Sequence, residues 1–486
     1  MPVNSVHPQY LEGFMAWSRA RDVLAGEDAI KSAGEKYLRR LNKQSDEEYA
    51  AYVMRASFFN GTARTADGYL GLVFRRSPFV KLPEENSALG RAMKAFRQDA
   101  DMFGSSFTSY ARQVVWEVIA VGRAGSLVDW EGDTENRAYV STYAAENILN
   151  WRVERINGRS IPTLVVLHEA CGSPVVRGDE FESTGGEQIR VLRLVRAEEG
   201  MQCVVELWRP EDTGDAKRKG EKVKWKRAET RMPLRLGKPL PLIPFVFHGP
   251  RHSRPDVDKL PLADVIAVNL DHYRLNADFK HGVHFTALPT AWVSGFEGKA
   301  SLQIGSSTAW VAENPNAKAG YLEFMGHGLN TFEKAMDRDE RLMAVLGSRL
   351  LESNKKVGET AEAIELRQTG EHSILSNIAT SVSESLSQVL RWVYWWNSTE
   401  ATPDEVTSGQ VTFELNTDFS TKGLSAQELQ SIVAAWQAGA ISRDTMSDLF
   451  RRGEVLPEGR TDEEEEKLVG AHGSPSAMSL GAKTSP

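Results

Sequence analysis

The chain has 486 residues, 41% of them hydrophobic and 26% charged, which are ordinary proportions for a soluble globular protein. Its 58 basic and 66 acidic residues give a formal net charge of -8. Proteins that hold nucleic acid tightly normally have a basic excess, so this charge argues against tight DNA binding and permits only a surface along which DNA slides. The length allows roughly two to four domains with ample core.

The two cysteines, Cys171 and Cys203, are expected in different strands and have no CxxC spacing. A disulfide framework or a cysteine-based zinc site is therefore not expected, and the chain fits a reducing cytoplasm. Residues 1–13 contain no basic start followed by an apolar run, so they do not predict a signal peptide. No stretch approaches about 18 uninterrupted apolar residues, so no membrane span is expected.

The first part of the chain has mainly helical patterns. Residues 2–13 are polar and are expected to extend along a neighbour or to stay loose. Helices are expected from Phe14 to Gly26, from there to Leu38, after Asp46 as N-cap, and over residues 99–121 with Phe103 on the apolar stripe. After this last helix, residues 124–130 are expected to form a strand.

Four further segments alternate with Gly, Pro and Asp residues, which predicts an antiparallel sheet built of hairpins. They are residues 161–170, 187–198, 201–210 and 221–229. The most basic stretch, residues 214–227, includes Trp225 and has the composition of a nucleic-acid patch. We favour a solvated hairpin tip whose lysines protect a sheet edge.

Residues 261–396 have a distinct order of patterns. An apolar stripe over residues 262–277 predicts a helix, and a short strand-rich insert punctuated by Gly, Pro and Asn follows. A second helical pattern starts near Asn330, and a polar segment separates it from a third over residues 359–396. The predicted order is helix, small β insert, helix, polar loop and long helix.

The C-terminal part begins with one alternating strand, residues 410–416, which is expected to rejoin the earlier sheet. Two helices are then expected: Ser425 caps the first with Glu428 in a capping box, Gly439 ends it, and Ser442 caps the second. The tail from Arg460 is acidic and then small and polar, and it is expected to be disordered.

The order of patterns over residues 261–396 resembles the core of a tailed-bacteriophage portal protein, in which two stem helices flank a β-containing clip, a tunnel loop follows and a long helix crosses the wing. The local sequence is also similar to one portal family, long catalogued as a domain of unknown function. The similar segments are YVMRASFFNGTARTADGYLGLVFRRSP at 52–78, PLIPFVFHG at 241–249, PLADVIAVNLDHYRLNADFKHGVH at 261–284 and GETAEAIELRQTGEHSIL at 358–375. The similarity extends from about Trp17 to Leu456.

The resemblance implies an α+β portal-type fold. Its divisions are a wing of helices and antiparallel sheet (1–255), stem helix 1 (256–282), a β clip (283–328), stem helix 2 (329–346), a tunnel loop (347–358), the long helix and a returning wing strand (359–420), crown helices (421–458) and a disordered tail (459–486).

The function that the resemblance implies is mechanical. Portals form a dodecameric ring at one capsid vertex of the virion, the channel through which double-stranded DNA is packaged and ejected without sequence specificity. The implied partners are the major capsid protein at the wing, the terminase large subunit, and later a head–tail adaptor at the clip. Such a ring assembles in the host cytoplasm and needs no cofactor and no covalent chemistry of its own.

Candidate DNA-facing residues lie in the second stem helix and the loop after it. Lys334, Arg338 and Arg341 have spacings that share one side of a helix, and nearby acids such as Asp337 offset their charge. Pairing within the helix or between subunits is the alternative to DNA contact. The polar loop between Gly347 and Gly358 adds Arg349, Asn354, Lys355 and Lys356 as channel candidates, or it is a plain surface turn.

The candidate partner-binding residues lie in the clip. Trp292 and Val293 belong to one strand-like segment, and Trp310 and Val311 belong to another. Because a two-stranded unit is marginal in water, neighbouring subunits are expected to complete it.

Signatures of catalysis are not found in the sequence: it has no P-loop, no GxSxG elbow and no HExxH. His281 and His284 share a helical face only if the helix continues past Gly282, and no third ligand is nearby, so no metal site is expected. An alternative function is a metal-dependent nuclease using Asp337 and Asp339, although solvated charge explains these acids better. Another ring-forming virion connector is the remaining alternative.

Overall fold

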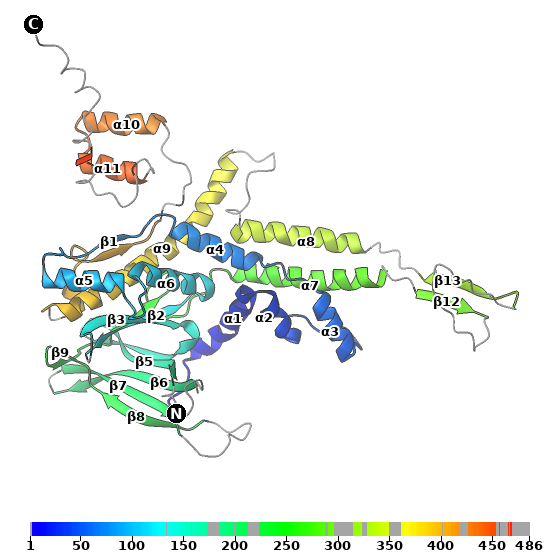
Figure 1. The fold of residues 1–486 in the computed structure, drawn as a ribbon, viewed down its shortest axis with the longest axis horizontal. Coiled ribbons are helices and arrows are strands. Elements are labelled where there is room, and N and C mark those ends of the chain that lie inside the picture. Colours follow the sequence, from blue (N-terminus) through cyan, green and yellow to red (C-terminus); the bar gives the residue numbers. More distant parts are fainter. Residues whose placement is uncertain are drawn as a thin grey trace, which may run out of the picture.

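The chain folds into a body of mixed helices and sheets, from which a long helical hairpin projects (Figure 1). The computed structural model describes residues 2–132, 134–156, 158–172, 185–198, 200–211, 223–286, 290–295, 314–322, 328–348, 361–400, 402–417, 419, 426–452, 456, 465 and 467–468. The combination of helices with antiparallel sheets confirms the expected α+β class.

The N-terminal helices are α1 (Pro8–Ala25), α2 (Glu27–Ser32), α3 (Asp46–Arg55), α4 (Gly61–Val73), α5 (Ala88–Gln98) and α6 (Phe107–Val121). The prediction that residues 2–13 extend along a neighbour or stay loose is wrong for residues 8–13, because α1 begins at Pro8. His7 caps this helix by accepting the Gln9 N–H at 3.2 Å, and its ring stacks on Trp151 with centroids 4.0 Å apart. As predicted, α1 ends at Gly26, whose φ of 96° suits glycine.

Two further helix starts differ from the predictions. Ser45, not Asp46, caps α3, in a capping box with Glu48. Residues 99–106 do not continue α6 towards the N-terminus but form a loop, and Ser106 caps the helix. Phe103, expected on the buried stripe, is 93% exposed in this loop.

Two antiparallel sheets form the β part of the body. A three-stranded sheet has the order β11-β2-β3, and a five-stranded sheet has the order β4-β5-β6-β7-β8, the expected meander of hairpins. Their strands are β2 (Ala124–Glu131), β3 (Arg137–Ala144), β4 (Ile148–Ile156), β5 (Arg159–Gly172), β6 (Gly185–Ala197), β7 (Gly200–Pro210), β8 (Trp225–Arg231) and β11 (Phe245–His248). A small pair, β9 (Leu234–Arg235) and β10 (Lys238–Pro239), joins β8 to β11.

The long helix α9 (Ala361–Asn397) forms the centre of the body, where it packs against α5, α6 and the three-stranded sheet. Its serines bind the strand β14 (Thr412–Glu414): Ser387 Oγ accepts the Phe413 N–H at 2.9 Å, and Ser383 Oγ accepts the Leu415 N–H at 2.9 Å. The predicted return of this strand to the earlier sheet is wrong, because β14 pairs with β1 (Phe79–Lys81).

The remaining elements are the hairpin and the C-terminal helices. The hairpin comprises α7 (Ala263–Thr286), β12 (Thr290–Ser294), β13 (Lys318–Leu322) and α8 (Leu329–Met343), and a π-helical turn, Ala344–Ser348, follows it. The last helices are α10 (Ala426–Gln437) and α11 (Arg443–Arg452). Ser442 caps α11 as predicted, by accepting the Thr445 N–H at 3.1 Å. Ser425 lies outside the described residues, and so do most positions after Arg460.

Candidate functional site: the projecting α7–α8 hairpin

The helices α7 and α8 run side by side away from the body and have the β12–β13 pair at their far end (Figure 1). At Gly282 a Cβ atom would lie 2.9 Å from Leu329 Cδ2, so the two helices approach closely there. Nearer the body, Asn276 Nδ2 contacts Met336 Sδ at 3.9 Å. The two helices are therefore packed against each other along the projection.

A buried asparagine attaches the base of α7 to the body. Asn269 is fully buried, and its Oδ1 accepts hydrogen bonds from Thr62 N at 3.0 Å and Thr62 Oγ1 at 2.8 Å. Its Nδ2 donates to the Phe59 carbonyl at 2.6 Å. All of these groups are at the N-terminus of α4, so one side chain satisfies backbone and side-chain groups that water does not reach.

The helix α3 supports the middle of α7. Tyr52 donates its hydroxyl to Asp278 Oδ1 at 2.5 Å, and burial together with this carboxylate raises the pKa of Tyr52 well above its ordinary value of 10. Arg55 Nη2 lies 3.5 Å from His281 Nδ1, and the pKa of His281 is lowered, first by burial and then by Arg55. The projection is therefore supported by the body over much of α7.

The three basic residues predicted on α8, namely Lys334, Arg338 and Arg341, are all exposed. Asp337 and Arg341 have the i,i+4 spacing of an ion pair, but Arg341 Nε donates to the Asp337 backbone carbonyl at 3.0 Å and not to its carboxylate. Arg338 Nη2 instead lies 3.2 Å from Asp339 Oδ1.

Asp337 and Asp339, the candidate metal-binding acids, lie in different environments. Asp337 is exposed, but Asp339 is only 3% exposed, so the prediction of solvated charge is wrong for Asp339. The next residue of α8 also faces α7, since Glu340 Oε1 lies 3.4 Å from His272 Nε2. Within the described residues, no group of three His, Cys, Asp or Glu side chains is placed to hold a metal ion, although α7 does continue through Gly282 past His281 and His284.

The C-terminal end of α8 packs tightly on one side and is open on the other. In the π-helical turn, a Cβ atom on Gly347 would lie 2.6 Å from Thr65 Cγ2, so the turn lies directly on α4. Leu342, Val345 and Leu346 nevertheless remain 40–41% exposed. The loop candidates that follow them, Arg349, Asn354, Lys355 and Lys356, lie outside the described residues.

The tip of the hairpin exposes aromatic and aliphatic side chains. β12 and β13 pair with Trp292 opposite Gly320, and the Trp292 indole lies over the glycine, 3.0 Å from where a Cβ would stand. Trp292 is 43% exposed, Val293 37%, Tyr321 55% and Phe285 53%. The other two clip candidates, Trp310 and Val311, lie outside the described residues. Reasoning from sequence missed Tyr321 and Phe285, although aromatic residues next to Trp292 in a short insert were a usable signal.

Comparisons with known proteins cover the hairpin and the long helix. Residues 261–397, from the start of α7 to the end of α9, match a family model described as a domain of unknown function (DUF4055). No curated protein matches the chain. Among the described residues, no helix has the length and apolar character needed to cross a membrane.

The chain is also similar to solved structures of gene transfer agent (GTA) particles. A chain from the neck of the empty particle, computed with C6 symmetry, is 10% identical with a TM-score of 0.39, and the match covers 89% of this chain and 99% of that one. A chain from the native virion has 10% identity and a TM-score of 0.37 over 89% and 99% of the two chains. One from the native neck, computed with C12 symmetry, has 9% identity and a TM-score of 0.37 over 88% and 99%.

Proposed function

We propose that the protein is a phage portal, a ring-forming head–tail connector at one capsid vertex. The observation that carries the proposal is the projecting hairpin, whose tip and whose end at the π-helical turn leave seven large apolar side chains exposed in a single copy. They are Phe285, Trp292, Val293, Tyr321, Leu342, Val345 and Leu346. Exposed apolar clusters of this kind mark interaction surfaces, and identical copies around an axis would cover them.

The charge of α8 fits a channel that conducts DNA without holding it. Lys334, Arg338 and Arg341 alternate along the helix with exposed acids, among them Glu333 and Asp337. Each contact with phosphate would be weak because the acids offset it, and a ring would repeat the contact many times. In this proposal the ring has twelve copies, and the wing, stem, clip, tunnel-loop and crown divisions follow the boundaries given above.

The finer assignments follow from the same proposal. The tip around Trp292 would bind the terminase large subunit and later a head–tail adaptor, and the body would contact the major capsid protein. The loop residues Lys355 and Lys356 would narrow the channel. In this proposal the hairpin has a mechanical role. Conducting double-stranded DNA into and out of the capsid requires no covalent bond to be made or broken by this protein.

The oligomeric state tests the proposal directly. We expect purified protein to form rings with a central channel in negative-stain images, and mass photometry to give a closed assembly near twelve copies. A protein that stays monomeric at every concentration would contradict the portal assignment. A closed ring of different size that associates with virion tails but never with capsids would favour another connector.

A further inference from the structure

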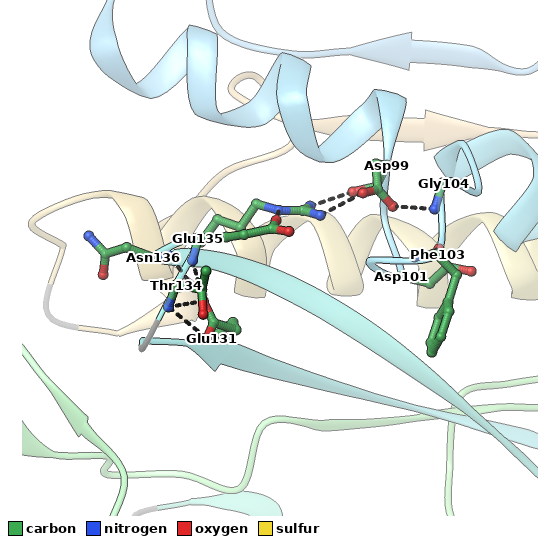
Figure 2. Close-up of polar contacts among 9 residues, drawn as sticks. Asp99, Asp101, Phe103, Gly104, Glu131, Thr134, Glu135 and Asn136 are labelled. Carbon is green, nitrogen blue, oxygen red and sulfur yellow. Dashed lines mark hydrogen bonds and ion pairs between the residues drawn. The ribbon is translucent and has the colours of Figure 1, made fainter. Parts of the chain in front are cut away.

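The loop of residues 99–106, between α5 and α6, holds a large apolar side chain in solvent (Figure 2). Phe103 at its centre is 93% exposed. Burial of a phenylalanine side chain is favourable, so its exposure leaves that stabilisation unused in the single chain.

The conformation of this loop is fixed by its own aspartates. Asp101 Oδ1 accepts the N–H groups of Phe103 at 2.9 Å and Ser105 at 3.1 Å, and Asp99 Oδ1 accepts that of Gly104 at 3.0 Å. Met102 has a φ of 65°, a left-handed conformation that a non-glycine residue adopts only at a cost. Phe103 therefore lies on a loop whose backbone conformation is fixed by hydrogen bonds.

The loop is also tied to the outer edge of β3. Arg137 Nη2 lies 2.6 Å from Asp99 Oδ2, and Arg137 Nη1 donates to the Asp99 carbonyl at 2.6 Å. Val140 N donates to the Ala100 carbonyl at 2.9 Å. In Figure 2 the Phe103 side chain points away from the contacts around Asp99 and Gly104.

A single row of the three-stranded sheet connects this edge with the opposite one. Val140 on β3 pairs with Val128 on β2, and Val128 N donates in turn to the Pro244 carbonyl at 2.9 Å. The row thus runs from Ala100 through the two valines to Pro244. Since neighbouring strands lie about 4.8 Å apart, its ends are roughly 14 Å apart, on opposite edges of the sheet.

The Pro244 edge opens into a pocket of about 620 Å³. Leu242, Ile243 and Phe245, which flank Pro244, line it together with Ile161 of β5 and Trp392 of α9. Polar side chains, among them Ser253, Arg254 and Gln388, also line it, so the pocket has an apolar wall beside a polar one. Because a cavity of about 150 Å³ is enough for a benzene ring, this pocket has room for a phenyl group. We call it the β11 pocket.

We propose that Phe103 of one copy enters the β11 pocket of the next copy. The two features lie on opposite edges of one sheet, so neither can satisfy the other within a chain, and their contact between copies is head-to-tail, the kind that closes into a ring. Charge supports the same occupant: within the described residues, Asp101 of the loop has no ion pair, and neither has Arg254, which lines the pocket. The two acids that also line the pocket have cations of their own, since Asp404 pairs with Arg159 and Asp256 lies near Arg123. The inference rests on the proposed ring and names a contact that holds it.

A charged residue in place of Phe103 tests its contact with the β11 pocket. Phe103→Asp should raise the concentration needed for half-assembly at least about tenfold, as expected for a buried aromatic anchor. Leu236→Asp is the matched control, because Leu236 is 72% exposed and its φ of 50° suits aspartate. Phe103→Trp should retain assembly. Rings of Phe103→Asp that form at the wild-type concentration would overturn the contact but not the portal, whereas a monomeric wild type would contradict both.

Crosslinking tests the direction of the contact. In a background in which Cys171 and Cys203 are replaced by serine and alanine, Met102→Cys with Ser253→Cys keeps Phe103 and places one thiol on the loop and one on the exposed rim of the pocket. A short bis-maleimide should then link the assembled protein into a ladder from dimer to closed multimer, while either single cysteine gives none. Dimers from Met102→Cys alone would show a two-fold contact between loops and overturn the head-to-tail arrangement, as would the absence of any ladder in rings.

Discussion

The interior of the body and the tip of the hairpin both combine β-strands with aromatic residues, but only the interior is complete in one copy. In the body, His248 is fully buried between Ser126 Oγ at 2.5 Å and Ser385 Oγ at 2.7 Å, and Tyr110 bonds the same Ser126. At the tip, Trp292 covers a glycine and remains 43% exposed. The difference separates residues that fold the chain from residues that assemble it, and substitutions can test the division.

The largest effect on folding is expected from Phe107→Ala in the body. Phe107 is fully buried and contacts Phe413 and Phe96 with ring centroids 5.2 and 5.4 Å apart, so it joins α6 to β14 and α5. The substitution should lower the free energy of unfolding by about 3–5 kcal/mol. Phe285→Ala at the 53% exposed tip should cost less than about 1 kcal/mol, measured by chemical denaturation. Similar costs at both sites would remove the distinction.

The junction between the two regions is tested by Asn269→Leu. The leucine would leave Thr62 N, Thr62 Oγ1 and the Phe59 carbonyl without their buried partner. We expect a loss of about 2–3 kcal/mol in unfolding free energy, because an unsatisfied buried group costs about 1–3 kcal/mol. Asn276→Leu on the same helix, which removes the bond from Ser57 N and the weak contact with Met336 Sδ, is the control and should cost about 1 kcal/mol. A larger loss of unfolding free energy from Asn276→Leu than from Asn269→Leu would place the attachment further along α7.

The buried polar network makes the body sensitive to acid. Burial lowers the pKa of His248 to about 3 from an ordinary value of 6.5, so between these values the unfolded chain binds a proton that the folded chain does not. The contribution of neutral His248 to the free energy of unfolding is therefore fully present above pH 6.5. Below that pH it decreases by up to about 1.4 kcal/mol per pH unit, so that about 2 kcal/mol is lost by pH 5. His248→Gln should flatten the stability profile between pH 5 and 6.5 relative to wild type. An unchanged slope would mean that His248 does not contribute.

Local patterns in the sequence predict much of this fold but not its long-range contacts. The stripes of α7 and α8, the end of α1 at Gly26 and the cap Ser442 depend on near neighbours along the chain and are found as predicted. The start of α1 was missed because His7 stacks on Trp151, far away in sequence. The apolar spacing around Phe103 predicts a helix, but the side chains of Asp99 and Asp101 accept hydrogen bonds from the backbone of this segment and hold it as a loop.

The site could be predicted only in outline. Lys334, Arg338 and Arg341, which their spacing places on one side of α8, are exposed, and contact with DNA stays a prediction. It does not predict that Asp339 is buried, because that depends on how α8 packs on α7 and the body. Asn269 was not singled out either, since an asparagine within a helical stripe gives no sign that its partners are Thr62 and Phe59, more than 200 residues earlier.

A change at the tip should affect assembly while leaving folding nearly unchanged. Trp292→Ser removes a half-exposed side chain that rests on Gly320, so the free energy of unfolding should change by no more than about 1 kcal/mol. Ring formation or adaptor binding should weaken, as followed by mass photometry and pull-down. Met54→Ser, at a residue 73% exposed and away from the tip, is the control. Unchanged assembly and adaptor affinity would exclude a role for Trp292 in the contact.

The smallest effect on folding is expected from charge reversal on α8. Lys334→Glu with Arg341→Glu should change the unfolding free energy by less than about 0.5 kcal/mol, because exposed charges contribute little. Arg338→Glu is the contrasting variant: it removes the ion pair of the buried Asp339 and should cost about 1 kcal/mol or more. If Lys334 and Arg341 face a DNA channel, the double variant should lose association with two duplexes of unrelated sequence to the same extent.

Salt separates a DNA contact from an effect on ring shape. The screening length falls from about 10 Å at 0.1 M salt to about 3 Å at 1 M, so a defect caused by lost phosphate contacts should shrink as salt rises. We would measure association of purified rings with both duplexes across this range, beside the Arg338→Glu variant at matched ring concentration. A defect of equal size at every salt concentration would show that these side chains act on contacts between subunits. If the double variant binds DNA as wild type does, the exposed cations of α8 face away from the channel, and its lining has to come from other residues.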